Sequence, residues 1–101
     1  MEKLCPHYTL SLVLQVASQP NGIRFTVVSY NGAAELGFGE SDMCAVIKNL
    51  NSAVFYKSMT SYGDHTVWHD VYRPTYKSIP LYIKITLKET ERLLVISFKR
   101  R

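Results

Sequence analysis

A regular alternation of apolar and polar residues marks the C-terminal end of the chain as a pair of antiparallel strands. In residues 81–87 every second residue is apolar, which is typical of a strand with one buried face. Residues 92–99 form a second strand-like run, so the two runs predict a hairpin with one face in the core and the other in water. The residues expected on the core face are Leu81, Ile83, Ile85, Leu87, Leu94, Ile96 and Phe98.

The register of this hairpin follows from its apolar residues. When the apolar residues of both strands share a face, Ile83 opposes Ile96 and Tyr82 opposes Ser97. Lys99 then lies diagonally beside Tyr82, and side chains in that relation are about 7 Å apart and can contact one bound group. The pattern therefore places a phenol and an ammonium together on the open face of the sheet.

Helical spacing of apolar residues predicts two helices in the first half of the chain. The first follows Thr9, a suitable N-cap, and ends at the turn sequence of residues 19–22. The second opens at Ser41. Between them, residues 23–29 are β-branched enough to form a strand, although a short helix at residues 33–36 is an equal alternative.

Two further runs of aromatic and β-branched residues, 55–60 and 67–72, predict strands that complete an antiparallel sheet. A chain of 101 residues with 47% hydrophobic content is long enough to bury one core and too short for a second module. We therefore expect residues 1–101 to form a single α+β domain.

Positive charge is concentrated in the second half of the chain. Residues 1–54 hold three Lys and Arg against four Asp and Glu, whereas residues 55–101 hold nine against four. A basic half is typical of a protein that binds a polyanion, through counterion release and steering. The two cysteines, Cys5 and Cys44, are too few and too far apart for a disulfide framework or a zinc site, which favours a reducing cytoplasm. No apolar segment approaches the roughly 20 residues that would cross a bilayer.

Residues 55–74, FYKSMTSYGDHTVWHDVYRP, contain groups suited to proton transfer and phosphate contact. Imidazole, ammonium and guanidinium groups among aromatic rings can hold a sugar-phosphate backbone, stack a base and move protons. His65 and His69 are only a weak zinc signal because no third ligand is identified, so we expect no metal and no other cofactor. We expect His65 to be a structural residue hydrogen-bonded within its polar loop, and Trp68 to lie in the core. RNA is the expected substrate class.

The same segment, together with LYIKIT and LLVISFK further along, is similar to the motility quorum-sensing regulator (MqsR) toxin family. The resemblance is close over residues 43–99 and weaker before them. It implies a bacterial type II toxin of the cytoplasm with a RelE-like fold, an antiparallel β-sheet with about three helices packed on one face. It also implies cleavage of mRNA without a metal, and neutralisation by a cognate, MqsA-like antitoxin.

The resemblance further implies which residues form the active site. The family carries glutamine at the position of His69, so the role of that amide does not transfer directly. The matching catalytic positions are Lys57 in FYKSMT, His69 in VWHDVY, Tyr82 in LYIKIT and Lys99 in SFK. The basic and aromatic residues expected to contact RNA around them are Tyr56, Tyr72, Arg73 and Lys84.

Metal-free RNA cleavage can use the 2′-OH of the substrate as the nucleophile, so the protein must supply a base, an acid and positive charge. We expect Lys57 and Lys99 to stabilise the phosphate oxygens. His69, whose ordinary pKa is near neutrality, is expected to act as acid or base, with Tyr82 orienting the phosphate or assisting proton transfer. A non-catalytic RNA- or DNA-binding module and a protein-docking domain are the alternatives that the same surface allows.

Overall fold

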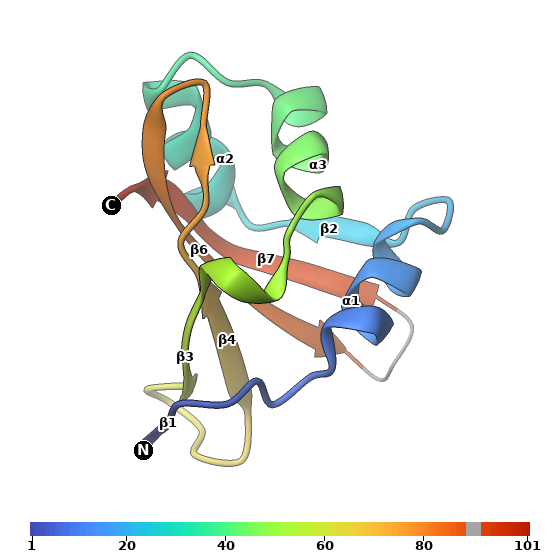
Figure 1. Cartoon of the computed structure of the whole chain (residues 1–101), viewed down its shortest axis with the longest axis vertical. Coiled ribbons are helices and arrows are strands. Elements are labelled where there is room, and N and C mark those ends of the chain that lie inside the picture. Colours follow the sequence, from blue (N-terminus) through green and yellow to red (C-terminus); the bar gives the residue numbers. More distant parts are fainter. Residues whose placement is uncertain (89–91) are drawn as a thin grey trace.

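The computed structural model of the chain describes residues 1–88 and 92–101 and has an α+β fold (Figure 1). The helices are α1 (Leu10–Ala17), α2 (Val27–Glu35) and α3 (Glu40–Lys48), with a short 3-10 helix η1 (Ser52–Val54). The strands are β1 (Glu2–Lys3), β2 (Ile23–Phe25), β3 (Phe55–Thr60), β4 (Trp68–Tyr72), β5 (Thr75–Tyr76), β6 (Ile79–Lys88) and β7 (Arg92–Arg100). The expected fold class is therefore confirmed.

The strands of the described residues form a sheet in the order β1-β3-β4-β6-β7-β2, and β5 pairs with the start of β6 outside this path. Neighbouring strands are antiparallel throughout, except that β2 runs parallel to β7. The predicted antiparallel sheet is thus confirmed, with one short parallel strand at its β2 edge.

The three helices pack against one face of the sheet, because residues from each of them join a single hydrophobic core cluster with β6 and β7. Fully or almost fully buried members are Val13 of α1, Ala33 of α2, Ile47 of α3, Ile83 of β6 and Val95 of β7. The helices are eight or nine residues long. Within the described residues, none of them is long and apolar enough to cross a membrane.

The segment predicted as a strand over residues 23–29 is a strand only in its first half, and α2 follows directly. Thr26 explains the change, because its hydroxyl accepts a hydrogen bond from the N–H of Ser29 (3.1 Å) and so caps a helix. Gly32 lies inside α2, where an added Cβ would stand 2.1 Å from the carbonyl oxygen of Phe98. Glycine at this position therefore allows α2 to pack closely on β7 and does not break the helix.

The hairpin of β6 and β7 has a different register from the predicted one. Tyr82 opposes Lys99 directly, not Ser97. The observed pairing differs from the predicted one by two residues at Tyr82 and by one residue from Ile85 onward, because a β-bulge between Lys84 and Ile85 leaves Ile96 of β7 as an extra residue. Tyr82 and Lys99 are consequently closer than a diagonal pair. The buried residues of β7 are Leu93, Val95 and Phe98, in place of the predicted Leu94, Ile96 and Phe98.

The first residues of the chain are tied to β4 by a buried carboxylate. Asp70, which is 0% exposed, accepts hydrogen bonds from the backbone N–H groups of His7 (3.0 Å) and Tyr8 (2.9 Å). The His7 ring stacks on Trp68 with 5.3 Å between centroids, and the Nζ of Lys3 lies 4.2 Å from the centroid of the same indole. Trp68 is therefore half-buried beneath the N-terminal segment, and its predicted place in the core is wrong.

Candidate active site

The face of the sheet opposite the helices carries a row of directly opposed residues from four strands. Lys57 on β3 opposes Val71 on β4, Val71 opposes Lys84 on β6, and Lys84 opposes Ser97 on β7. Directly opposed residues share a face, so Lys57 and Lys84 project on the same side, with Val71 between them. Val71 is 0% exposed although it is not part of the core cluster.

The other sequence-predicted catalytic residues lie on this same open face. His69 stands two residues before Val71 on β4, and Tyr82 two residues before Lys84 on β6, so alternation directs both side chains to that face. Lys99 opposes Tyr82, with its Nζ 5.1 Å from the centroid of the phenol ring. The structure thus brings Lys57, His69, Tyr82 and Lys99 together on one surface.

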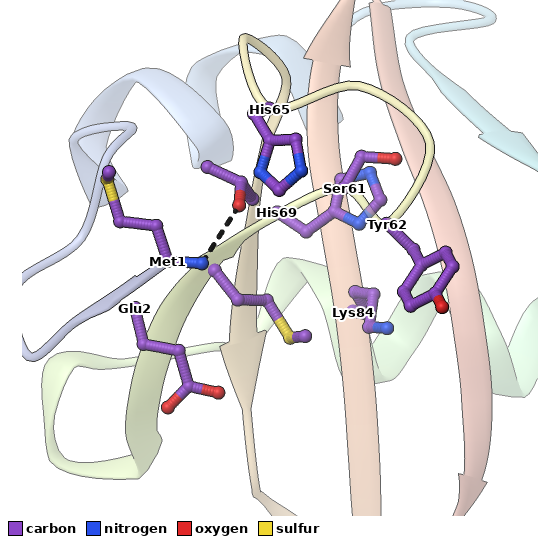
Figure 2. Close-up of a pocket in the computed structure, with 9 residues that line it drawn as sticks. Met1, Glu2, Ser61, Tyr62, His65, His69 and Lys84 are labelled. Carbon is purple, nitrogen blue, oxygen red and sulfur yellow. Dashed lines mark hydrogen bonds between the residues drawn. The ribbon is translucent and has the colours of Figure 1, made fainter.

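A pocket of about 690 Å³ opens at one end of this surface. His69 and Lys84 line it from the sheet, Tyr62 and His65 from the β3–β4 loop, and Glu2 from β1. Figure 2 shows Glu2 on one side of the pocket and Lys84 and Tyr62 on the other, with His65 in the loop above. The pocket therefore combines two imidazoles, an ammonium and a carboxylate, which is a set of groups able to transfer protons.

Lys57 is held by a carboxylate that the sequence did not reveal. Its Nζ donates a hydrogen bond of 2.6 Å to Oε2 of Glu2, and the two form an ion pair. The hydrogen bond that Lys57 donates to Glu2 raises the pKa of Lys57 and lowers the pKa of Glu2. A strand of two residues such as β1 has no periodicity, so its pairing with β3 and the arrival of Glu2 at the site left no signal in the sequence.

His69 and Lys84 are half-buried in the pocket, and burial is the largest influence on both. Burial, followed by the positive charge of Lys84, lowers the pKa of His69 below its ordinary 6.5. Burial, followed by the ammonium groups of Lys99 and Lys57, lowers the pKa of Lys84 below its ordinary 10.5. His69 is consequently neutral at physiological pH, whereas Lys84 is a stronger acid than a solvated lysine.

Two of the residues expected to contact RNA extend the open face beyond the pocket. Tyr56 is 42% exposed, and the guanidinium carbon of Arg73 lies 4.2 Å from its ring centroid. The Nζ of Lys57 lies 5.4 Å from the same ring. Tyr56, Arg73 and Arg101 line a separate hollow of about 270 Å³. An aromatic ring beside two guanidinium groups suits a nucleotide with its phosphate.

Tyr72 does not belong to this surface, so the prediction that it contacts RNA is wrong. It is 1% exposed, lies in the hydrophobic core cluster and packs edge-on against Phe55, with 5.4 Å between ring centroids. Burial raises the pKa of Tyr72 to about 12. Its hydroxyl has no hydrogen-bond partner among the described residues. A tyrosine with a polar tip suggested a surface position, but its pairing with Phe55 and Ile83 places it on the core face.

The β3–β4 loop also differs from its prediction. His65 is exposed and makes no hydrogen bond within the described residues, so it is not the loop-held structural histidine that was expected. Asp64 instead accepts bonds from the backbone and hydroxyl of Thr66 (2.9 and 2.7 Å). Tyr62, which no sequence argument singled out, is fully exposed beside the pocket. In residues 1–88 and 92–101, no three His, Cys, Asp or Glu side chains gather as metal ligands would.

Comparison with known proteins agrees with the resemblance seen in the sequence. The sequence model of the family described as "Motility quorum-sensing regulator, toxin of MqsA" matches residues 5–100. The chain is also 43% identical over 101 residues to the mRNA interferase toxin MqsR of Escherichia coli (strain K12), and the match covers the whole of both proteins. This chain therefore belongs to the MqsR toxin family.

Proposed function

We propose that the chain is a single-domain toxin of a type II toxin–antitoxin system, an endoribonuclease that cleaves mRNA with a sequence preference and thereby stops translation and growth. Membership of the MqsR family and the name of the E. coli relative, an mRNA interferase, support this activity. The observation that carries the proposal is the gathering of Lys57, His69, Tyr82 and Lys99 on one open face of the sheet. The family also predicts a RelE-like topology.

In the proposed reaction, the 2′-OH of the RNA attacks the adjacent phosphorus and the bond to the 5′-oxygen breaks. Neutral His69 takes the proton of the 2′-OH, which requires a base that is unprotonated at the working pH. Lys57 and Lys99 place positive charge at the phosphate oxygens as negative charge develops there. Tyr82 lies beside Lys99 and orients the phosphate through its hydroxyl.

The surface around Tyr56 and Arg73 holds nucleotides next to the cleaved bond. Stacking of a base on an exposed aromatic ring contributes about 1–3 kcal/mol and tolerates any base. Lys84 contributes charge to the same surface. The sequence preference of cleavage then depends on contacts in the pocket, where the β3–β4 loop approaches the substrate.

Digestion of a defined, ribosome-free RNA in excess EDTA tests this function. We expect cleavage that persists in EDTA and leaves a 2′,3′-cyclic phosphate and a 5′-hydroxyl end. RNA that is retarded in a gel but stays intact would instead identify a non-catalytic RNA- or DNA-binding module. RNA that is neither cleaved nor shifted at any salt concentration would identify a protein-docking domain.

The partner and the cellular location follow from the family. We propose that an MqsA-like antitoxin binds the chain in the cytoplasm, since the family is described as the toxin of MqsA. When the chain is co-expressed with the protein encoded by the neighbouring gene, and that protein is left untagged, the two should co-purify as a complex. Loss of RNA cleavage on complex formation, restored when the antitoxin is removed, is the expected functional result.

A further inference from the structure

Three lysines share the open face, but their surroundings differ. The ammonium of Lys57 is held by Glu2 at 2.6 Å. Lys99 is exposed, with its ammonium beside the ring of Tyr82. Lys84 is half-buried, and within residues 1–88 and 92–101 its ammonium makes no hydrogen bond and no ion pair. Of the two lysines on this face whose ammonium groups make no hydrogen bond or ion pair among the described residues, Lys84 is therefore the half-buried one.

Lys84 also has the central position of the three. It lies on β6 and is flanked by Val71 of β4 and Ser97 of β7, so that its neighbours in the row are an aliphatic side chain and a small hydroxyl. It lines the same pocket as His69, the base of the proposed reaction, whereas Lys57 and Lys99 do not line that pocket. A phosphate bound there can therefore contact both His69 and Lys84.

Cleavage of RNA needs an acid as well as a base, because the 5′-oxygen leaves poorly as an alkoxide. We infer that Lys84 is the general acid of the site and His69 its general base. The inference rests on the proposed function. The 2′-oxygen bonds to phosphorus and gives its proton to the His69 imidazole, the bond from phosphorus to the 5′-oxygen breaks, and Lys84 gives a proton to that oxygen. Exchange with water then returns a proton to the lysine and removes one from the histidine.

The electrostatics agree with this division of roles. The ammonium groups of Lys99 and Lys57 add to burial in lowering the pKa of Lys84, which makes it a readier proton donor. Glu2 has the opposite effect on Lys57 and raises its pKa, which leaves Lys57 as a fixed charge. The other residues with titratable groups that line the pocket are Met1 with its amino group, Glu2 from β1, Tyr62 and His65 from the β3–β4 loop, and His69 from β4.

A substrate with sulfur in place of the bridging 5′-oxygen tests the assignment, because a thiolate leaves without protonation and needs no general acid. On ordinary RNA, Lys84→Ala should slow single-turnover cleavage by about 10²–10⁴-fold. Lys84→Ala should cleave the 5′-thio RNA at a rate within about threefold of that of the parent protein. Lys57→Ala, which removes charge stabilisation, should show the same defect on both RNAs. Lys88→Ala, on the exposed end of β6, should match the parent on both.

Lys84→Arg separates proton donation from charge and packing. Arginine keeps the positive charge and a long stem but cannot be deprotonated at accessible pH. This variant should therefore lose activity on ordinary RNA and regain it on the 5′-thio RNA. Equal defects of both Lys84 variants on the two RNAs, or full activity of Lys84→Arg on ordinary RNA, would overturn the inference. If the parent protein cleaves neither RNA, the proposed function itself fails, which is a different result.

Discussion

His69 stands on the open face of β4, where burial and the ammonium of Lys84 keep its imidazole neutral at physiological pH. The same pocket holds Lys84, whose pKa is lowered by burial and by the positive charges of Lys99 and Lys57. The two groups therefore have complementary protonation states in the free protein, a base without its proton and an acid with it. At the residue scale, this pairing is the basis of the metal-free cleavage that we propose.

Replacement of His69 tests the base. His69→Ala should lower cleavage by about 10²–10⁴-fold if the imidazole accepts the proton. Because only neutral His69 can act and its pKa lies below 6.5, the kcat/KM of the parent should fall as the pH drops below that value. It should fall again at alkaline pH, where Lys84 loses the proton that it donates. The measurement is a pH–rate profile of RNA cleavage.

His69→Gln provides the sharper comparison, because it installs the residue expected in the family. We expect the acid limb of the pH profile to vanish in this variant. Should the glutamine protein cleave at the same rate with the same profile, His69 only positions the substrate.

Replacement of Glu2 tests the role of its contact with Lys57. In the free protein the Glu2 carboxylate accepts a hydrogen bond from the Lys57 ammonium, the group that we propose binds a phosphate oxygen of the RNA. Glu2→Gln removes this competition and should tighten RNA binding about two- to fivefold, in the range of a single exposed ion pair. Fluorescence anisotropy with an RNA that carries a 2′-deoxy sugar at the cleaved position measures binding alone.

Glu35→Gln is the matched control, since Glu35 is an exposed carboxylate on α2. It changes the net charge by the same amount away from the site. An equal gain in affinity for the two variants would assign the effect to net charge and not to Lys57.

At the scale of elements, the N-terminal segment completes the site although it forms only two residues of strand. Its first residues pair with β3 as β1, and the segment then crosses to β4, where Asp70 accepts hydrogen bonds from the N–H groups of His7 and Tyr8. Met1 adds to this pairing, because the N–H of Thr60 donates to its carbonyl (2.9 Å). The wall of the pocket formed by Glu2 therefore depends on a carboxylate buried on the opposite face of the sheet.

Replacement of Asp70 tests that dependence. Asp70→Ala leaves the N–H groups of His7 and Tyr8 without their acceptor and should cost about 1–3 kcal/mol of the free energy of unfolding. Amide hydrogen exchange of His7 and Tyr8 should rise more than exchange in the core of β6. Asp64→Ala, in the exposed loop, should change neither quantity in this way. Unchanged protection of both amides in Asp70→Ala would show that the segment is held by other contacts.

The elements themselves were largely predictable, because periodicity reports burial on one face. The alternation in residues 81–87, the aromatic and β-branched run of residues 55–60 and the helical spacing after Thr9 all identified real elements. The register of β6 and β7 was not predictable, since the extra residue of the bulge, Ile96, lies in the continuous apolar run of residues 93–96, which does not show which face is buried. Capping by Thr26 likewise decided between strand and helix through one hydroxyl.

The candidate site was predictable only in part. Tyr82 and Lys99 share a face through strand alternation, which a sequence can show, whereas Lys57 and His69 were named from the family resemblance. Tyr72 was misplaced because the strand around it is covered on both faces, so the pattern of apolar residues does not show which face of the strand is the core face. Glu2 was missed because it reaches the site through a tertiary contact with no local pattern.

At the scale of the whole molecule, the sheet separates a hydrophobic side from a charged one. The hydrophobic core between the helices and the sheet contains Tyr72. Its buried hydroxyl has no hydrogen-bond partner among the described residues. An unsatisfied buried hydroxyl costs stability, and a buried phenol also resists ionisation. The stability of the fold should therefore respond to alkaline pH through this residue.

Tyr72→Phe tests that response. Between pH 10 and 12 the unfolded chain releases the phenol proton while the folded protein, in which the pKa of Tyr72 is about 12, retains it. The free energy of unfolding of the parent should therefore fall with rising pH by up to about 2 kcal/mol more than that of the variant. Near pH 8 the variant should be at least as stable as the parent. Urea unfolding at pH 8, 10 and 11.5 measures both effects, and parallel pH dependences of the two proteins would contradict the assignment.

The stacking of His7 on Trp68 gives the molecule a built-in optical reporter. The chain has a single tryptophan, so its emission comes from one known place. Release of the N-terminal segment would move that indole into water and shift its emission to longer wavelength without unfolding the core. Fluorescence can therefore follow, in one cuvette and without labels, whether the strand that carries Glu2 stays docked while RNA or a protein partner binds.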